Sequence, residues 1–149
     1  MADKMEEKLF KKTEGTLYNY KNLEIKIMNL NIDIETLRRN DQGVSSIRYE
    51  EKTQSTNKFN SSVENEVVNR EKLIKKLENE RDCNVNLKRK IDNALKTLPE
   101  EEFKLVDLRY FKGKQTWTAI GRHLNMDKDY CCRKRCDIIE KLARLIYSF

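Results

Sequence analysis

The sequence is poor in the residues that build turns and catalytic sites. Its 149 residues include only four glycines, one proline and one histidine. An enzyme needs a nucleophile with a base, a carboxylate pair in a pocket or a glycine-rich phosphate loop, and this composition argues against each of them. We therefore expect no catalytic residues. The scarcity of glycine and proline predicts few turns and long helices.

Long apolar stretches are also absent. No segment approaches the roughly 18 to 20 apolar residues that a membrane-spanning helix needs. The first ten residues, MADKMEEKLF, lack the apolar core of a signal peptide. We therefore expect a cytoplasmic protein. Hydrophobic and charged residues each make up 38% of the chain, a balance that favours elongated helical pieces over one thick globular core.

The four cysteines do not form a recognisable disulfide or metal pattern. Cys131, Cys132 and Cys136 crowd one predicted helix, where backbone geometry disfavours pairing among them, and Cys83 stands apart. Together with His123 they invite a zinc interpretation, but Cys131 and Cys132 point in different directions and no CxxC spacing is present. We expect reduced thiols, no metal ion and no cofactor.

The first third of the chain carries the pattern of a coiled coil. Apolar residues recur there at alternating spacings of three and four. These positions, expected to mediate oligomerisation, are Tyr20, Leu23, Ile27, Leu30, Ile34 and Leu37. Ile25, Met28 and Ile32 widen the apolar stripe, as expected when a helical hairpin also dimerises. We therefore expect a homodimer or higher homo-oligomer.

Two long helices and a loop are predicted for residues 1–97. The segment from about 40 to 62 is rich in Ser, Asn, Thr and Gln without a sustained period, which predicts a loop. A second helix is expected from about Ser62 to Lys96. Each helix spans about 35 residues, or roughly 50 Å, so the chain would form an antiparallel hairpin. Heptad spacing leaves open a rival arrangement, in which each helix pairs with its counterpart in a second subunit.

A denser series of helix signals begins after Leu98. Pro99 suits a first helical position and Gly113 suits a helix end, which predicts a helix from about Pro99 to Lys112. The apolar face of this helix is expected to pack against the residue that opens the next helix. In particular, Trp117 is expected to be buried against Phe103, Val106 and Tyr110.

Two further helices are predicted behind this one. Thr116 is suited to cap a short helix, and Asn125, which tolerates a left-handed backbone, is suited to end it. Asp127 is suited to cap a last helix that runs from Lys128 to about Tyr147.

The spacing of small and apolar residues in these two helices is typical of a helix-turn-helix. Gly121 is small where the two helices approach closely. Apolar contacts are expected from Ile120, Leu124, Met126 and Cys131. The sequence thus predicts an all-α protein: a long helical hairpin over 1–97, then a three-helix DNA-binding domain over 98–149.

Positive charge is concentrated in the same segment. The interval from Lys112 to Arg135 holds seven basic residues against Asp127 and Asp129. A local cationic surface of this density attracts polyanions through phosphate contacts and counterion release. Nucleic acid is therefore the expected partner, and no membrane partner is expected.

The last predicted helix supplies the residues expected to face bases. The first turns of a helix in the major groove face base edges. The residues expected to face base edges from these turns are Lys128, Asp129, Cys132 and Arg133. Arg133 is best suited to guanine, because its guanidinium group can donate two hydrogen bonds to the O6 and N7 acceptors of that base. Lys128 could equally hold a phosphate.

Other residues are expected at the DNA backbone. Lys114, Thr116 and Arg122 are placed to hold phosphates, with solvation as the alternative for each. Tyr130 either packs on the preceding helix or touches the backbone.

The run Arg133, Lys134 and Arg135 either belongs to the DNA interface or forms an ordinary solvated basic face. Lys134 departs from the pattern, because this position is usually apolar in a helix-turn-helix. Either the helix is rotated or Lys134 leans on the aliphatic stem of Arg135.

Two family resemblances follow from these motifs. The segment LPEEEFKLVDLRYFKGKQTWTAIGRHLNMDKDYCCRKR resembles the fourth region of sigma factors, with its Leu-Pro-acidic opening, Leu-Arg-Tyr, Ile-Gly-Arg and basic last helix. Most of the chain resembles the ArpU and RinA-type phage late transcriptional regulators, with their helical N-terminal half, SSVENEV-like segment and terminal Tyr-Cys-x-Arg-Lys-Arg helix.

The resemblance implies a specific function. It implies sequence-specific binding to double-stranded promoter or operator DNA, and activation of phage or prophage late genes for packaging and lysis in low-GC Gram-positive bacteria. It also implies contact with RNA polymerase.

Two other functions remain open on the sequence. A small terminase subunit also joins a helix-turn-helix to oligomerising helices, and ring stoichiometry would distinguish it. A sigma-like adaptor that binds RNA polymerase would use its cations on an acidic protein surface, and would not bind DNA alone.

Overall fold

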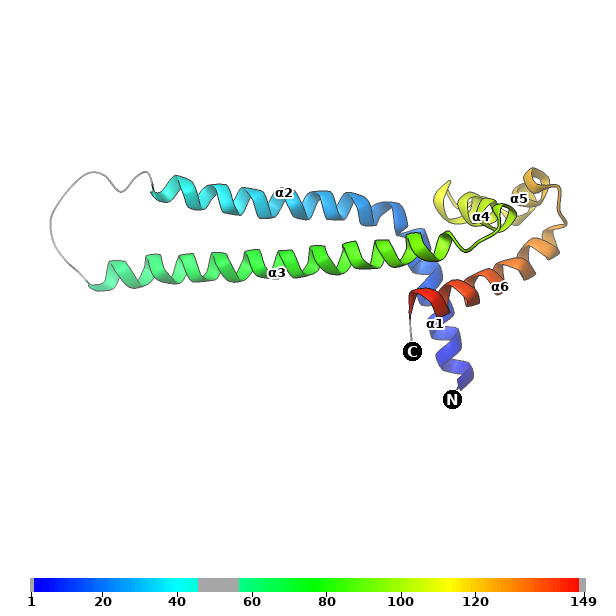
Figure 1. The fold of residues 1–149 in the computed structure, drawn as a ribbon, viewed down its shortest axis with the longest axis horizontal. Coiled ribbons are helices and arrows are strands. Elements are labelled where there is room, and N and C mark those ends of the chain that lie inside the picture. The colour runs from blue at the N-terminus through cyan, green and yellow to red at the C-terminus, as the bar shows by residue number, and fades with distance from the viewer. Residues whose placement is uncertain (1, 46–56, 148–149) are drawn as a thin grey trace. The chain divides into compact units, whose positions relative to one another are not determined.

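The computed structural model describes residues 2–45 and 57–147, and every regular element in these ranges is a helix (Figure 1). The elements are α1 (Ala2–Tyr18), α2 (Tyr20–Ser45), α3 (Asn57–Leu95), α4 (Glu100–Val106), η1 (Asp107–Phe111), α5 (Trp117–Leu124) and α6 (Lys128–Ile146). The all-α prediction is confirmed for these residues, which contain no strand.

The chain divides into two compact units. The first unit joins Met1–Glu24 to Asn86–Phe149, and the second is Ile25–Val85. This division differs from the expected domains at 1–97 and 98–149. The physical reason is that α1 packs against α6 and η1, so the N-terminal helix completes the core of the C-terminal helices.

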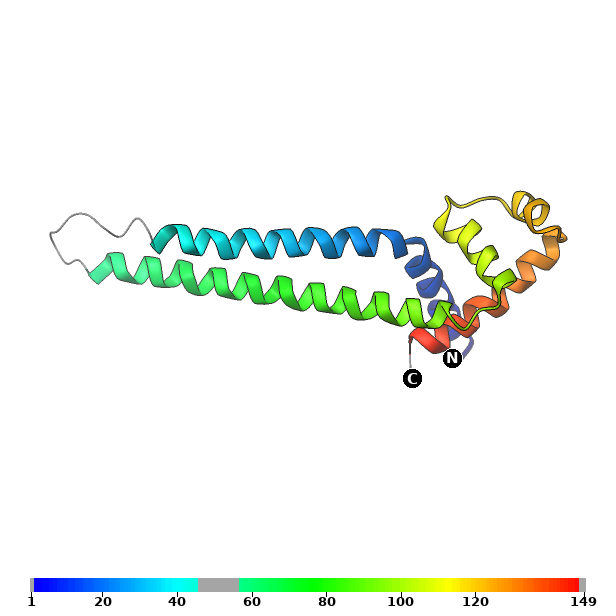
Figure 2. The ribbon, with the colours of Figure 1, turned by 45° about the horizontal axis from the view of Figure 1, so that its top comes forward.

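The second unit consists of parts of α2 and α3. Figures 1 and 2 show the two helices side by side and running in opposite directions. Leu30 and Ile34 are buried, and the ion pair of Lys26 with Glu80, at 2.9 Å, crosses between the helices. Arg38 pairs with Glu78 in the same way.

Most residues of the expected oligomer seam pack within one chain. Leu30 and Ile34 are buried in the second unit, and Leu23 belongs to the core of the first. The hydroxyl of Tyr20 donates a hydrogen bond to Asp92. Ile27 and Leu37 are half-buried. The exposed large apolar residues of α2 are instead those that widened the stripe: Ile25, Met28 and Ile32.

Helix occupies both ends of the expected loop at about 40–62. α2 continues to Ser45 and α3 begins at Asn57, and the central part of the expected loop, residues 46–56, lies outside the described residues. Adding a polar residue to an existing helix costs only tenths of a kcal/mol. A polar composition therefore did not mark the helix ends.

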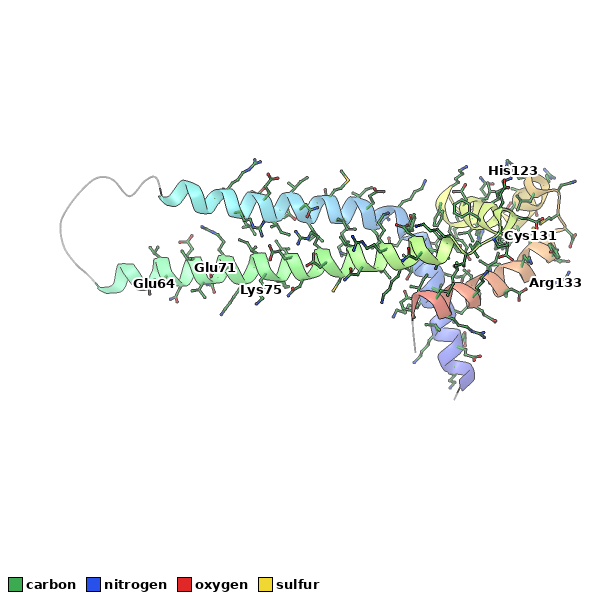
Figure 3. All side chains as sticks on the ribbon, in the orientation of Figure 1. Glu64, Glu71, Lys75, His123, Cys131 and Arg133 are labelled. Atoms are coloured by element: carbon green, nitrogen blue, oxygen red, sulfur yellow. The ribbon has the colours of Figure 1, made fainter. Side chains whose placement is uncertain are left out.

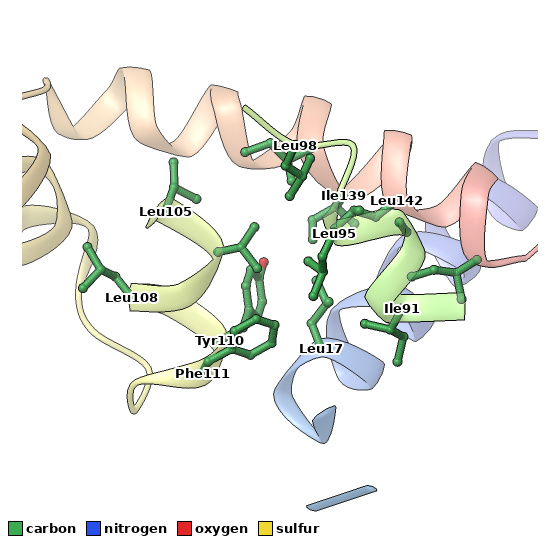
Figure 4. Close-up of a cluster of buried hydrophobic side chains, with 14 of the residues drawn as sticks. Leu17, Ile91, Leu95, Leu98, Leu105, Leu108, Tyr110, Phe111, Ile139 and Leu142 are labelled. Carbon is green, nitrogen blue, oxygen red and sulfur yellow. The ribbon is translucent and has the colours of Figure 1, made fainter. Parts of the chain in front are cut away.

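The core of the first unit draws on α1, the start of α2, the end of α3 and all the C-terminal helices, and Figure 4 shows part of it. Leu17, Ile91, Leu105, Ile139 and Leu142 are at most 1% exposed. Complete burial of one such side chain contributes about 1.5–3 kcal/mol. This core fixes the positions from which α5 and α6 extend.

The helix predicted from about Pro99 to Lys112 is present as α4 and η1. Pro99 stands just before α4. The last turn widens into a π-helix, because the Lys112 amide donates to the carbonyl of Asp107 at 2.8 Å. Gly113 then ends the helix with φ at +90°, a value at which glycine is unstrained.

Candidate nucleic-acid interface

A tight turn joins α5 to α6. Asn125 has the left-handed conformation, with φ 57° and ψ 44°, and the Met126 amide donates to the Gly121 carbonyl at 2.8 Å. A Cβ on Gly121 would lie only 2.7 Å from the Met126 carbonyl oxygen. The small residue expected at this close approach is confirmed, and its nearest neighbour is the backbone of the turn.

Both helices begin with the predicted caps. The Thr116 hydroxyl accepts a hydrogen bond from the Ala119 amide at 3.2 Å. The Asp127 carboxylate accepts from the amides of Asp129 and Tyr130, at 3.0 and 3.4 Å. These caps satisfy amides that have no partner within the helix, and they set where α5 and α6 start.

The inner sides of α5 and α6 close on the core. Ile120 and Cys131 are fully buried, whereas Leu124 and Met126 are half-buried. Burial raises the pKa of the Cys131 thiol. This cysteine therefore acts as a small core residue, consistent with its contact role in the expected pattern.

Trp117 is only half-buried and lies beside two guanidinium groups. The guanidinium carbons of Arg109 and Arg135 are 4.7 and 5.6 Å from its ring centroid. The expected partner Phe103 is 39% exposed, so the expected burial of Trp117 holds only in part. The physical reason is that arginine covers its ring.

Three exposed cations surround the start of α6. Arg122 on α5 and Lys128 and Arg133 on α6 are exposed, and they form no ion pair with any residue that the structure describes. Figure 3 labels Arg133 on α6 together with His123 on α5. Lys114 is also exposed, and its ammonium group lies 5.3 Å from the ring centroid of Tyr18.

A shallow hollow lies at the α5–α6 turn. It is lined by Thr118, Gly121, Arg122, Asn125, Met126, Asp127 and Lys128. Arg122 and Lys128 thus border one concave surface.

The basic run at 133–135 is divided among three directions. Arg133 points to solvent, whereas the Lys134 ammonium pairs with Glu102 of α4 at 3.3 Å. Arg135 Nε lies 3.6 Å from the Glu14 carboxylate of α1. Successive residues of a helix are separated by 100°, so three adjacent side chains cannot share one face.

The ion pair of Lys134 accounts for its unusual position. A hydrogen bond with Glu102 raises the pKa of Lys134 above its usual value. The side chain is only 30% exposed. A polar residue thus occupies the usually apolar position because α4 supplies a carboxylate for it.

The remaining predicted residues of α6 lie near its outer surface. Asp129 is exposed, Tyr130 is 41% exposed and Cys132 is half-buried. Tyr130 is therefore not a core residue, and its contact with the DNA backbone stays a prediction. Further along α6, the exposed residues include Asp137 and Glu140. Lysine and arginine are also exposed there, so both signs of charge occur beyond the second turn.

The residues that the structure describes hold no group of three or more His, Cys, Asp or Glu side chains suited to a metal ion. The cysteines are free thiols: Cys131 is buried, and Cys83 and Cys136 are exposed. Within 2–45 and 57–147, no helix is both long enough and apolar enough to cross a membrane.

Comparison with known proteins assigns a family. The family described as "Protein of unknown function (DUF722)" matches residues 1–144. The chain belongs to this family. No curated protein and no solved structure matches it. The DUF722 match covers α1 to α5 and α6 as far as residue 144, so the family includes helices from both ends of the chain that build the first unit.

Some residues near the candidate interface of this DUF722 chain were missed by sequence reasoning. Phe10 and Glu14 of α1 contact Arg135, and Arg109 donates a hydrogen bond to the Gln115 carbonyl at 2.8 Å. Neither Phe10 nor Leu17 was predicted to be buried, although their seven-residue separation is a helical spacing that could have indicated a buried face. No local pattern could indicate that this face packs against residues more than 100 positions later in the chain.

Proposed function

We propose that this chain is a sequence-specific DNA-binding transcriptional regulator, in which α5, the turn and α6 form a helix-turn-helix. The first two turns of α6 would enter the major groove, where Asp129, Cys132 and Arg133 face base edges. The proposal assigns no catalytic role to the chain and places it in the bacterial cytoplasm.

One observation carries this proposal. At the turn between α5 and α6, Gly121 allows the close approach of the backbone and Asp127 caps α6. Around this turn Arg122, Lys128 and Arg133 are exposed, and they form no ion pair with any described residue. Unpaired cations at the start of a helix suit phosphate and guanine, because both offer strong acceptors. Asp127 and Asp129 are exposed beside these cations, and the Asp127 carboxylate is engaged as the cap of α6.

The regulated genes follow from the resemblance to phage late regulators and the fourth region of sigma factors. We assign activation of phage or prophage late genes to the chain on that resemblance, with RNA polymerase as the second partner. The helical hairpin formed by α2 and α3 would then serve self-association, which places two reading helices on one operator.

Binding to mixed-sequence duplex DNA at several salt concentrations tests the proposal. Fluorescence anisotropy should give a binding constant whose logarithm falls linearly with the logarithm of the salt concentration, with a slope of about −0.9 for each phosphate neutralised. Lys128→Ala or Arg122→Ala should each reduce the magnitude of that slope by about 1.

A second cation of α6 serves as the control for this DNA-binding test, and two outcomes would contradict the proposal. Arg144 is an exposed cation in the last turn of α6, so Arg144→Ala should leave the slope unchanged. Absence of binding at low salt would contradict DNA recognition and point to an RNA-polymerase adaptor. Binding by rings of many copies would instead favour a small terminase subunit.

A further inference from the structure

Side chains from four elements form a ring–guanidinium stack in the first unit. Its members are Phe10 of α1, Arg135 of α6, Trp117 of α5 and Arg109 of η1. The guanidinium carbon of Arg135 lies 5.5 Å from the Phe10 centroid and 5.6 Å from the Trp117 centroid. Arg109 lies 4.7 Å from the Trp117 centroid. Each distance is within the range of a cation–π contact.

A carboxylate of α1 completes the stack. Glu14 Oε1 lies 3.6 Å from Arg135 Nε and accepts a hydrogen bond from the Tyr110 hydroxyl at 2.6 Å. The side chains of Glu14 and Arg135 are 21% and 27% exposed. The Glu14 carboxylate therefore balances the charge of Arg135 inside the unit, and the buried Arg135 Nε has no hydrogen-bond partner among the described residues.

We propose that α1, through Phe10 and Glu14, holds Arg135 against Trp117 and thereby positions α5 and α6 for DNA. Arg135 is then a positioning residue and makes no DNA contact, in contrast to its neighbour Arg133. This inference rests on the proposed function, and it adds that the DNA-binding unit is discontinuous in sequence.

The location of the stack explains how it acts on the interface. Trp117 is the first residue of α5, directly after the cap Thr116. Arg135 lies two residues beyond Arg133 on α6. Binding sites work when supporting residues hold the contacting groups within about 0.5 Å of the productive geometry. Loss of the stack would therefore shift the start of α5 relative to Arg133.

The single tryptophan of the chain reports directly on the stack. In the full-length protein without DNA, Phe10→Ala, Glu14→Gln and Arg135→Lys should each move the Trp117 emission maximum to the red and increase its quenching by acrylamide. Helix content by circular dichroism should remain unchanged. Arg133→Lys is the matched control, because it alters an outward arginine of α6 and should leave the fluorescence unchanged.

DNA binding by the same variants separates positioning from phosphate contact. Arg135→Lys keeps the charge but loses the planar group that stacks. A positioning role predicts at least a tenfold loss of affinity for the preferred duplex, with affinity for mixed-sequence DNA within twofold of wild type. A phosphate contact predicts near-wild-type binding by Arg135→Lys and a smaller salt slope for Arg135→Gln.

The measurements distinguish a failure of the role of α1 from a failure of DNA binding. Unchanged Trp117 fluorescence in Phe10→Ala and Glu14→Gln would overturn the role of α1, and phosphate-like behaviour of Arg135 would overturn its positioning role. If Phe10→Ala unfolds, Glu14→Gln decides the matter, because it keeps the side-chain volume and an acceptor for Tyr110. If the wild-type chain binds no DNA, the proposed function fails, while the fluorescence still decides whether α1 holds the stack.

Discussion

Gly121 sets how closely α5 can approach the turn that follows it. An added Cβ would lie 2.7 Å from the Met126 carbonyl oxygen, and the backbone atoms there cannot move aside as a flexible side chain would. We expect Gly121→Ala to lower the free energy of unfolding by about 1–3 kcal/mol, the usual range for overpacking. Urea denaturation followed by circular dichroism measures this.

Gly15 provides the control for that substitution. It lies within α1 and a Cβ there would meet nothing within 4 Å. Gly15→Ala should raise stability by about 0.5–1 kcal/mol, because alanine favours the helix. If both alanine variants were equally stable, the close approach at Gly121 would not be a real constraint.

Asp92 gives the first unit a dependence on pH. Burial acts to raise its pKa, but hydrogen bonds from Tyr20 and Lys88 outweigh burial, and the pKa of this carboxyl is lowered. A carboxyl with a lowered folded-state pKa stabilises the fold above its unfolded-state value. The contribution is lost as pH falls through the folded-state pKa.

The variant Asp92→Asn should therefore be less stable than wild type at pH 7, by about 1 kcal/mol. The difference should shrink as pH falls below the usual carboxyl value of about 4. Chemical denaturation at pH 7 and pH 3 checks this, with Glu71→Gln on the exposed surface of α3 as control. A difference that stays constant between the two pH values would refute the role of the charge.

At the scale of residues, the sequence predicts what local chemistry decides. Thr116, Asn125 and Asp127 perform their expected tasks because a cap or a left-handed turn depends on a few neighbouring atoms. The direction of Lys134 and Arg135 could not be predicted in this way. It depends on the carboxylates of Glu102 and Glu14, which come from other helices.

At the scale of elements, one polar side chain stands out within α3. The Asn84 Nδ2 is buried and has no hydrogen-bond partner among the described residues. A buried polar atom without a partner costs about 1–3 kcal/mol, whereas a polar residue in a helix seam can specify register. We expect Asn84→Leu to stabilise the chain by about 1–2 kcal/mol in thermal or urea denaturation.

Asn79 offers a matched comparison on the same helix. It is exposed, so Asn79→Leu should change stability by less than about 0.5 kcal/mol. Destabilisation by Asn84→Leu would show instead that the amide has a bonding partner in solution.

Apolar patterns predict that a helix is present more readily than where it ends. Apolar spacing predicted α2 and α3 because each buries one stripe, and caps predicted the starts of α5 and α6. The separation of α1 from α2 at Asn19 was not predicted. Leu17 before the break and Leu23 after it belong to the same core, so the apolar pattern did not indicate where one helix ends and the next begins.

At the scale of the whole molecule, the exposed stripe of α2 predicts how copies associate. Ile25, Met28 and Ile32 are 56%, 59% and 57% exposed, and they recur at helical spacing on one face of α2. Sedimentation should find a wild-type dimer, and Met28→Glu should weaken that dimer at least tenfold, because a charge would be buried in the contact.

Val68 supplies the control, as an exposed apolar residue of α3. Val68→Glu should leave the sedimentation coefficient unchanged. A monomeric wild type at tens of micromolar would contradict self-association through α2.

The central claim is that the first turns of α6 read DNA sequence, and selection from a pool of random duplexes tests it most directly. Full-length wild type, Arg133→Ala and Arg144→Ala would each be mixed with the pool at near-physiological salt, and bound duplexes sequenced. We expect wild type and Arg144→Ala to enrich the same guanine-containing site, and Arg133→Ala to lose the guanine preference, worth about 1–3 kcal/mol. Absence of enrichment by the wild type, or an unchanged site with Arg133→Ala, would contradict the claim.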